Sequence, residues 1–124
     1  MEEGLLYPKK PKKKKKVRHP DSIMHRSDGT CYLCMLLNGD GRKHGILHRH
    51  HVFGGPNRIH SEEYGLTVWL CVEHHETGPM AAHRNKAVAD ILHQTGQQAF
   101  EETHTRKEWM TIFGKNYLEG ENEC

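Results

Sequence analysis

The sequence predicts a small α+β domain in which two short strands and C-terminal helices are held together by a zinc ion. Three observations predict it: apolar stretches of strand length at residues 46–53 and 66–70, a helical pattern from Pro79 onward, and two pairs of zinc-ligand residues that flank the strands. Only 35% of the 124 residues are hydrophobic, so the core must be small. Such a chain usually needs a metal, a disulfide or a partner to stabilise its fold.

The strand region has clear turn signals. Residues 38–41 read Asn-Gly-Asp-Gly, which is typical of hairpin turns, so a short hairpin is expected there. The strand over residues 46–53 ends at a Gly-Gly-Pro cluster, which is expected to open a loop as far as Gly65. The second strand, residues 66–70, runs directly into Cys71.

The C-terminal part is expected to be helical. Pro79 suits the first position of a helix, and Gly96 is expected to interrupt that helix. Thr105 and Glu108 form a capping-box pattern for a further short helix, which Gly114 should end.

Two local motifs predict a structural zinc site. Cys31 and Cys34 form one half-site and Cys71 and His74 the other, and the two-residue spacers let each pair converge on one ion. Three thiolates and one imidazole complete a tetrahedron and leave no position open for a substrate. The alternatives are that the cysteines are buried small apolar residues or a redox pair. Cys124 lies in an acidic terminus and is expected to be a bystander.

The basic charge is concentrated in an N-terminal tail. Residues 1–26 are expected to be a disordered tail, 27–117 the domain, and 118–124 an acidic tail. The basic residues of positions 1–18 are Lys9, Lys10, Lys12, Lys13, Lys14, Lys15, Lys16 and Arg18. They account for eight of the 18 lysines and arginines, so the rest of the chain carries a net charge of about −4 with histidine neutral. One interpretation is sequence-independent contact with phosphates, and another is a solubilising arm. The run also weakly resembles a nuclear localisation signal.

No stretch of the sequence has the features of a signal peptide or a membrane span. We therefore expect a cytoplasmic protein of a bacterium or phage-infected host, without a membrane partner. In a reducing compartment, closely spaced cysteines are more often a metal site than a disulfide.

The histidine-rich segments resemble a known nuclease family. Residues 47–52 read Leu-His-Arg-His-His-Val at a strand end, and residues 70–75 read Leu-Cys-Val-Glu-His-His before a helix. This order is similar to the HNH (ββα-metal) endonucleases, and residues 78–85 further resemble a phage or mobile-element subgroup. The resemblance covers residues 31–85 and implies a zinc-stapled ββα-metal core with C-terminal helices.

The resemblance implies a role for each histidine of the motif. His51 would be the general base, and His50, His75 and His83 would hold a divalent catalytic ion, namely Mg²⁺, Mn²⁺, Ni²⁺ or Zn²⁺. Histidine suits the base role because its unperturbed pKa of about 6.5 lies near neutral pH. His48 shares a strand face with His50 and is a candidate hydrogen-bond partner of a ligand. Single histidines elsewhere are expected to serve packing or the surface: His60, His93 and His104.

One position departs from the family pattern. The family places an asparagine just before the second strand, where it orients the catalytic histidine, but this chain has Tyr64 and Gly65 there. Asn57 and Asn85 are candidate substitutes, and the sequence does not choose between them. Candidate phosphate contacts are Arg49 and Arg58.

The predicted function is a metal-dependent endonuclease that hydrolyses phosphodiester bonds, most simply in DNA. The alternative is a non-catalytic zinc module on the same scaffold that binds nucleic acid or protein, for which the missing asparagine is the motive. A third possibility is a nuclease-fold inhibitor or adaptor encoded by a mobile element.

Overall fold

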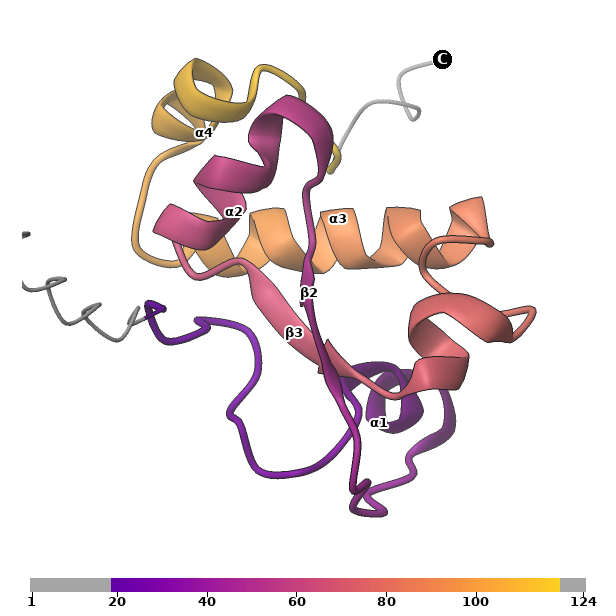
Figure 1. Cartoon of the computed structure of the whole chain (residues 1–124). Helices are drawn as coiled ribbons and strands as arrows, with labels where there is room; N and C mark the ends of the chain where they lie inside the picture. Colours follow the sequence, from indigo (N-terminus) through magenta and orange to yellow (C-terminus); the bar gives the residue numbers. More distant parts are fainter. Residues whose placement is uncertain (1–18, 119–124) are drawn as a thin grey trace, which may run out of the picture.

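The computed structural model describes residues 19–118, and these form a small α+β fold in which helices surround a pair of strands (Figure 1). The elements in chain order are α1 (Tyr32–Asn38), β2 (His48–His51), the 3₁₀ turn η1 (Gly55–Asn57), α2 (Arg58–Glu63), β3 (Thr67–Leu70), the π-helical turn η2 (Glu73–Thr77), α3 (Lys86–Glu101) and α4 (Arg106–Phe113). The lysine run and Cys124 lie outside the described residues, as does most of the acidic C-terminal tail. Within residues 19–118, no helix has the length and apolar character needed to cross a bilayer.

The two strands form an antiparallel pair at the centre of the fold. Their register places His48 opposite Leu70 and His51 opposite Thr67. On β3, Val68 and Leu70 are fully buried. The α+β class expected from the two apolar stretches is therefore confirmed, with strands shorter than the stretches themselves.

An aromatic core joins the strand pair to the C-terminal helices. Phe53 follows β2 and contacts Trp109 and Phe113 of α4, with ring centroids 5.2 and 5.1 Å away. Helix α3 crosses behind the strands in Figure 1, and its residue Gly96 approaches Val52 and Phe53. This packing fixes the C-terminal end of β2, which carries His50 and His51.

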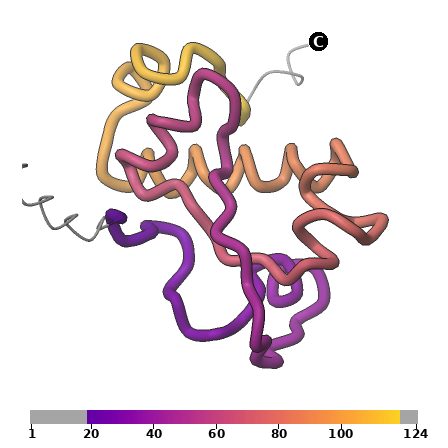
Figure 2. Tube along the Cα trace, viewed as in Figure 1, coloured from indigo at the N-terminus to yellow at the C-terminus, as the bar shows by residue number. Residues whose placement is uncertain are grey.

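The segment before α1 runs beside β3 (Figure 2). The Ser22 hydroxyl donates to the Thr67 carbonyl, and the backbone N–H of Trp69 donates to His25 Nδ1 over 3.0 Å. Residues 22–25 therefore pack on the fold, although the sequence assigned them to the tail.

The hairpin expected around residues 38–41 is wrong, because a helix ends there. Asn38 ends α1, and Gly39 is its C-cap with φ of 64°. An Asn-Gly pair provides left-handed backbone, which a helix end uses as readily as a hairpin turn. The strand-like pairing nearby is a single bridge between Thr30 and Lys43.

The loop expected between the strands is wrong in part, because it contains η1 and α2. Pro56 is the second residue of η1, as its fixed φ allows, and the chain continues as helix from Arg58 to Glu63. Ser61 on α2 is fully buried, and its hydroxyl bonds to the N–H and carbonyl of Phe53. Tertiary packing therefore stabilises a helix too short to form alone.

The expected bounds of the C-terminal helices are wrong for α3 and confirmed for α4. Helix α3 begins at Lys86 and not at Pro79, because the Asn85 side chain caps it by accepting from Val88 N–H. Gly96 does not interrupt α3 but lies buried within it. The capping box of Thr105 and Glu108 is confirmed, as is the helix end at Gly114, where φ is 77°.

Candidate metal centres and the His51 cluster

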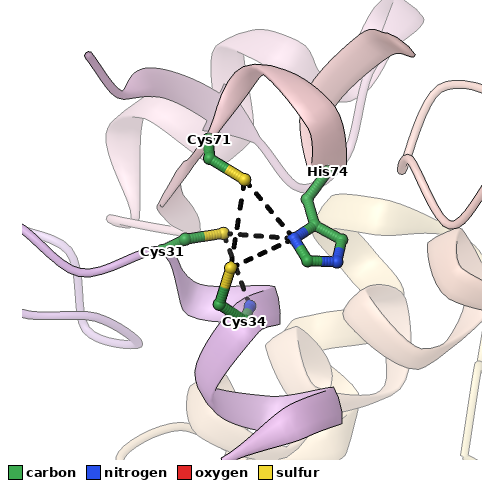
Figure 3. Close-up of side chains that lie close together, drawn as sticks. All are labelled: Cys31, Cys34, Cys71 and His74. Carbon is green, nitrogen blue, oxygen red and sulfur yellow. Dashed lines mark hydrogen bonds between the residues drawn. The ribbon is translucent and has the colours of Figure 1, made fainter. Parts of the chain in front are cut away.

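The first site is a buried cluster of Cys31, Cys34, Cys71 and His74 (Figure 3). Cys31 is the N-cap of α1 and Cys34 lies in its first turn, so the helix start brings both thiols together. Cys71 follows β3, and η2 then turns His74 Nδ1 toward the three sulfurs. The two predicted half-sites therefore meet.

The spacing of the four ligand atoms fits a zinc ion. His74 Nδ1 lies 3.6 Å from Cys31 Sγ, 3.4 Å from Cys34 Sγ and 3.4 Å from Cys71 Sγ, and the last two sulfurs are 3.9 Å apart. Zn–S bonds of about 2.3 Å and Zn–N bonds of about 2.0–2.1 Å give tetrahedral edges of about 3.8 Å between sulfurs and about 3.6 Å between sulfur and nitrogen. The cluster can hold zinc with little rearrangement.

Burial disfavours thiolates in this cluster unless a cation lies beside them. Burial, together with the neighbouring thiols, raises the pKa of Cys34 to about 12, and burial raises the pKa of Cys71. A thiolate there needs a positive ion beside it, which zinc supplies. His44, which the sequence did not single out, lies with Nε2 3.7 Å from Cys34 Sγ and can donate to that thiolate.

The second site is a group of three histidines, His50, His75 and His83. His50 comes from β2, His75 from η2, and His83 from the segment that folds back on η2 through a bond between Ala82 N–H and the His74 carbonyl. The predicted ligands of the second ion thus lie together.

Their ring nitrogens have metal-ligand spacing. His75 Nε2 lies 3.2 Å from His83 Nε2, and the His50 ring centroid is 5.2 Å from that of His75 and 5.0 Å from that of His83. Burial first, and then the charges of His75 and His83, lowers the pKa of His50 to about 3. Burial also lowers the pKa of His75. Neutral imidazoles keep the lone pairs that bind a metal.

His48 contacts His75, a member of this histidine cluster. Its Nδ1 is 2.9 Å from His75 Nδ1, so one of the two nitrogens donates to the other. If His75 Nδ1 carries the proton, its Nε2 lone pair faces His83, which is how an outer hydrogen bond fixes the tautomer of a metal ligand. His48, His75 and Glu76 also form an alternative ligand group, which shares His75 with the first.

His51 lies on the other face of β2, in a separate cluster with Arg49 and Glu62. His51 Nε2 is 2.9 Å from Glu62 Oε1, and Arg49 Nη1 donates to the same oxygen over 2.6 Å. The second carboxylate oxygen lies 2.6 Å from His19 Nδ1. The sequence missed Glu62, because its contact with His51 depends on α2, which the sequence did not predict.

The candidate orienting and phosphate-binding residues do not form one cluster. Asn85 is engaged in capping α3 and in a bond to the Pro79 carbonyl. Asn57 precedes α2 without a side-chain cap bond. Arg58 is exposed and lines a pocket of about 470 Å³ together with His51.

The histidines assigned to packing or surface contact aromatic rings. His93 stacks on Phe53 with centroids 4.9 Å apart, and His104 stacks on Phe100 at 4.2 Å. His60 meets Phe113 edge to face at 5.7 Å.

Comparison of the chain with protein-family models, with curated proteins and with solved structures finds no match.

Proposed function

We propose that this protein is a metal-dependent endonuclease that hydrolyses phosphodiester bonds in DNA and has the ββα-metal architecture of the HNH nucleases. One observation carries the proposal: His50, His75 and His83 converge with metal-ligand spacing, and His51, the next residue on β2, binds a carboxylate on the other face of the strand. The order of β2, β3 and the histidine-bearing η2 agrees with the motif order that the sequence resembles.

The chemistry of phosphodiester hydrolysis gives each group a task. A divalent ion held by His50, His75 and His83 would neutralise charge on the scissile phosphate. His51 would take the proton of the attacking water. Because side chains alternate along a strand, the consecutive residues His50 and His51 can serve as ligand and base without competing for one position.

The Cys31, Cys34, Cys71 and His74 cluster would hold a structural zinc that supports this arrangement. It fixes η2 against the start of α1, and His74 and His75 are consecutive residues of η2. A closed set of four protein ligands leaves no room for substrate, so this ion has no direct part in the reaction.

Substrate contact is assigned to exposed positive charge near His51. Arg58 lines the same pocket as His51, and His19, the first described residue after the lysine run, lines it too. Phosphate contacts of this kind position a nucleic acid without reading its sequence.

The proposal is tested by incubating plasmid DNA with the zinc-loaded protein and Mg²⁺, Mn²⁺, Ni²⁺ or Zn²⁺. Wild type is expected to nick the plasmid, and His51→Ala to nick it about 10²–10⁴-fold more slowly with unchanged Mn²⁺ affinity by calorimetry. His75→Ala should bind Mn²⁺ more weakly, and its rate should recover in part at high metal concentration. His104→Ala, a histidine of neither cluster, is the control.

A gel shift without nicking, under every metal, would contradict the proposal and favour the non-catalytic binding module. A His51→Ala protein that cleaves normally, or that loses the ion as severely as His75→Ala, would show that His51 is not the base.

A further inference from the structure

We propose that Glu62 is the positioning residue of His51, acting where the family pattern has an asparagine and this chain has none. The inference rests on the proposed function, since it assigns how the proposed base is oriented. The sequence candidates for this task were Asn57 and Asn85, and neither has a side-chain hydrogen bond to His51 among the described residues.

The geometry joins Glu62 to one particular nitrogen of His51. The distance of 2.9 Å between His51 Nε2 and Glu62 Oε1 is that of a hydrogen bond, and the side chains of both residues are partly buried, at 14% and 30% exposed. A carboxylate can only accept, so the 2.9 Å contact places the proton on Nε2, and the longer 3.4 Å approach of Arg49 Nη1 to that nitrogen is then no hydrogen bond. The imidazole then has its lone pair on Nδ1, and Nδ1 is the atom left to accept a proton.

Glu62 is held as an anion by its other partners. Its pKa is lowered to about 2, mainly by the hydrogen bond from Arg49 and also by those from His19 and His51. The carboxylate therefore stays charged across the working pH range. A fixed anion at Nε2 would stabilise the imidazolium that forms when the base takes a proton.

Arg49 also gains a role from this arrangement. Its Nη1 donates to Glu62 over 2.6 Å and its side chain is only 15% exposed. A guanidinium in this position holds the carboxylate in place, so we assign Arg49 to the support of Glu62. The phosphate contact is then assigned to the exposed Arg58.

In the proposed reaction the oxygen of water forms a bond to phosphorus while the proton of that water moves to His51 Nδ1. The bond between phosphorus and the leaving oxygen breaks, and that oxygen takes a proton from solvent. Glu62 gains and loses nothing in this step, because it acts only through the orientation and charge of His51.

A double-mutant cycle separates this role from a merely structural one. Glu62→Gln keeps the size of the side chain and is expected to lower the turnover number for plasmid nicking about 10–100-fold, by analogy with the loss when the hydrogen-bond partner of a metal-bound histidine is changed. Mn²⁺ affinity and DNA affinity should stay at wild-type values. Glu63→Gln, the exposed neighbour on α2, is the matched control and should cleave normally.

The cycle is completed with His51→Ala. If Glu62 acts through His51, the double variant should cleave no more slowly than His51→Ala alone. A further 10–100-fold loss in the double variant would overturn the inference, and so would a His51→Ala protein with wild-type activity.

A second measurement does not depend on cleavage. Nitrogen-15 NMR of the zinc-loaded wild-type protein at neutral pH should show His51 as the Nε2–H tautomer. Observation of the Nδ1–H tautomer would overturn the inference even in an active enzyme. An inactive wild-type protein with the expected tautomer would instead contradict the proposed function and leave the Glu62–His51 bond established, although its catalytic meaning would be lost.

Discussion

In each of two pairs of consecutive histidines, the two side chains contact different groups. His50 faces the histidine cluster while His51 binds Glu62, and His74 faces the cysteines while His75 faces His83. On β2 this division follows from the alternation of side chains along a strand. In η2 it follows from successive residues pointing around a helical turn, here a π-helical one of the kind often found at functional sites.

The residues that sequence could identify are those with local spacing. The cysteine pair, the Cys-x-x-His pair and the consecutive histidines are each readable within a few positions, and the structure brings together the ligands predicted for each ion. Glu62 and His44 carried no such signal. Their contacts with His51 and Cys34 join residues 11 and 10 positions apart and depend on how the chain between them folds.

We predict that His93 lowers the stability of the fold at acidic pH. Burial lowers the pKa of His93 below its ordinary 6.5. As pH falls below about 6.5 the unfolded chain therefore binds a proton that the folded protein does not, so stability is lost. His93→Phe keeps a ring against Phe53 and removes this titration, and its urea midpoint should fall less than that of wild type between pH 7.5 and 5.5.

Both proteins must be measured with zinc present, because zinc binding itself weakens in acid. The comparison between variant and wild type cancels that common effect. Identical pH dependence in the two proteins would show that His93 contributes nothing to acid sensitivity.

The elements were harder to predict than the ligands because one local signal serves two structures. Gly39 ends α1 with the same left-handed backbone that an Asn-Gly hairpin turn requires, so the dipeptide alone could not distinguish them. Helix α2 depends on the burial of Ser61 against Phe53 rather than on propensity. By contrast, α4 carries its own capping box and its C-terminal glycine, and its bounds were predicted closely.

The packing of α3 against the strand pair requires glycine at position 96. A Cβ added there would lie 3.0 Å from Phe53 Cε2 and 3.3 Å from Val52 Cγ1. Phe53 is 2% exposed and is held by the rings of α4, so it has little room to move. Gly96→Ala should therefore lower the free energy of unfolding, because overpacking of about 1–3 kcal/mol exceeds the gain in helix propensity of about 1 kcal/mol.

The measurement is a thermal or urea melt of Gly96→Ala beside Gln98→Ala, an exposed position on the same helix. The control should change stability by no more than about 0.5 kcal/mol. A more stable Gly96→Ala protein would mean that Gly96 is tolerated in α3 rather than required by its packing.

For the molecule as a whole, we predict that folding requires zinc, because the core is small. Ligands from α1 and from the junction of β3 with η2 meet in it, so the ion would link segments that are far apart in sequence. Removal of zinc by a chelator, or Cys31→Ser, should abolish the cooperative melt seen by circular dichroism. Cys124→Ser, outside the cluster, should melt as wild type does. An unchanged cooperative melt after confirmed loss of zinc would contradict a structural site.

We predict that the lysine run contributes phosphate contacts to DNA binding. The described chain begins at His19, whose ring bonds to Glu62 in the His51 cluster. Each lysine that neutralises a phosphate releases counterions and steepens the salt dependence of binding by about 0.9 in log–log slope. Deletion of residues 1–18 should therefore weaken DNA affinity and flatten that slope, while turnover of bound DNA survives. A full-length variant with glutamine at the seven tail lysines and at Arg18 separates charge from length, and it should match the deletion. Equal affinity and equal slope in wild type and both variants would show that the run makes no phosphate contacts and serves only as a spacer or a targeting signal.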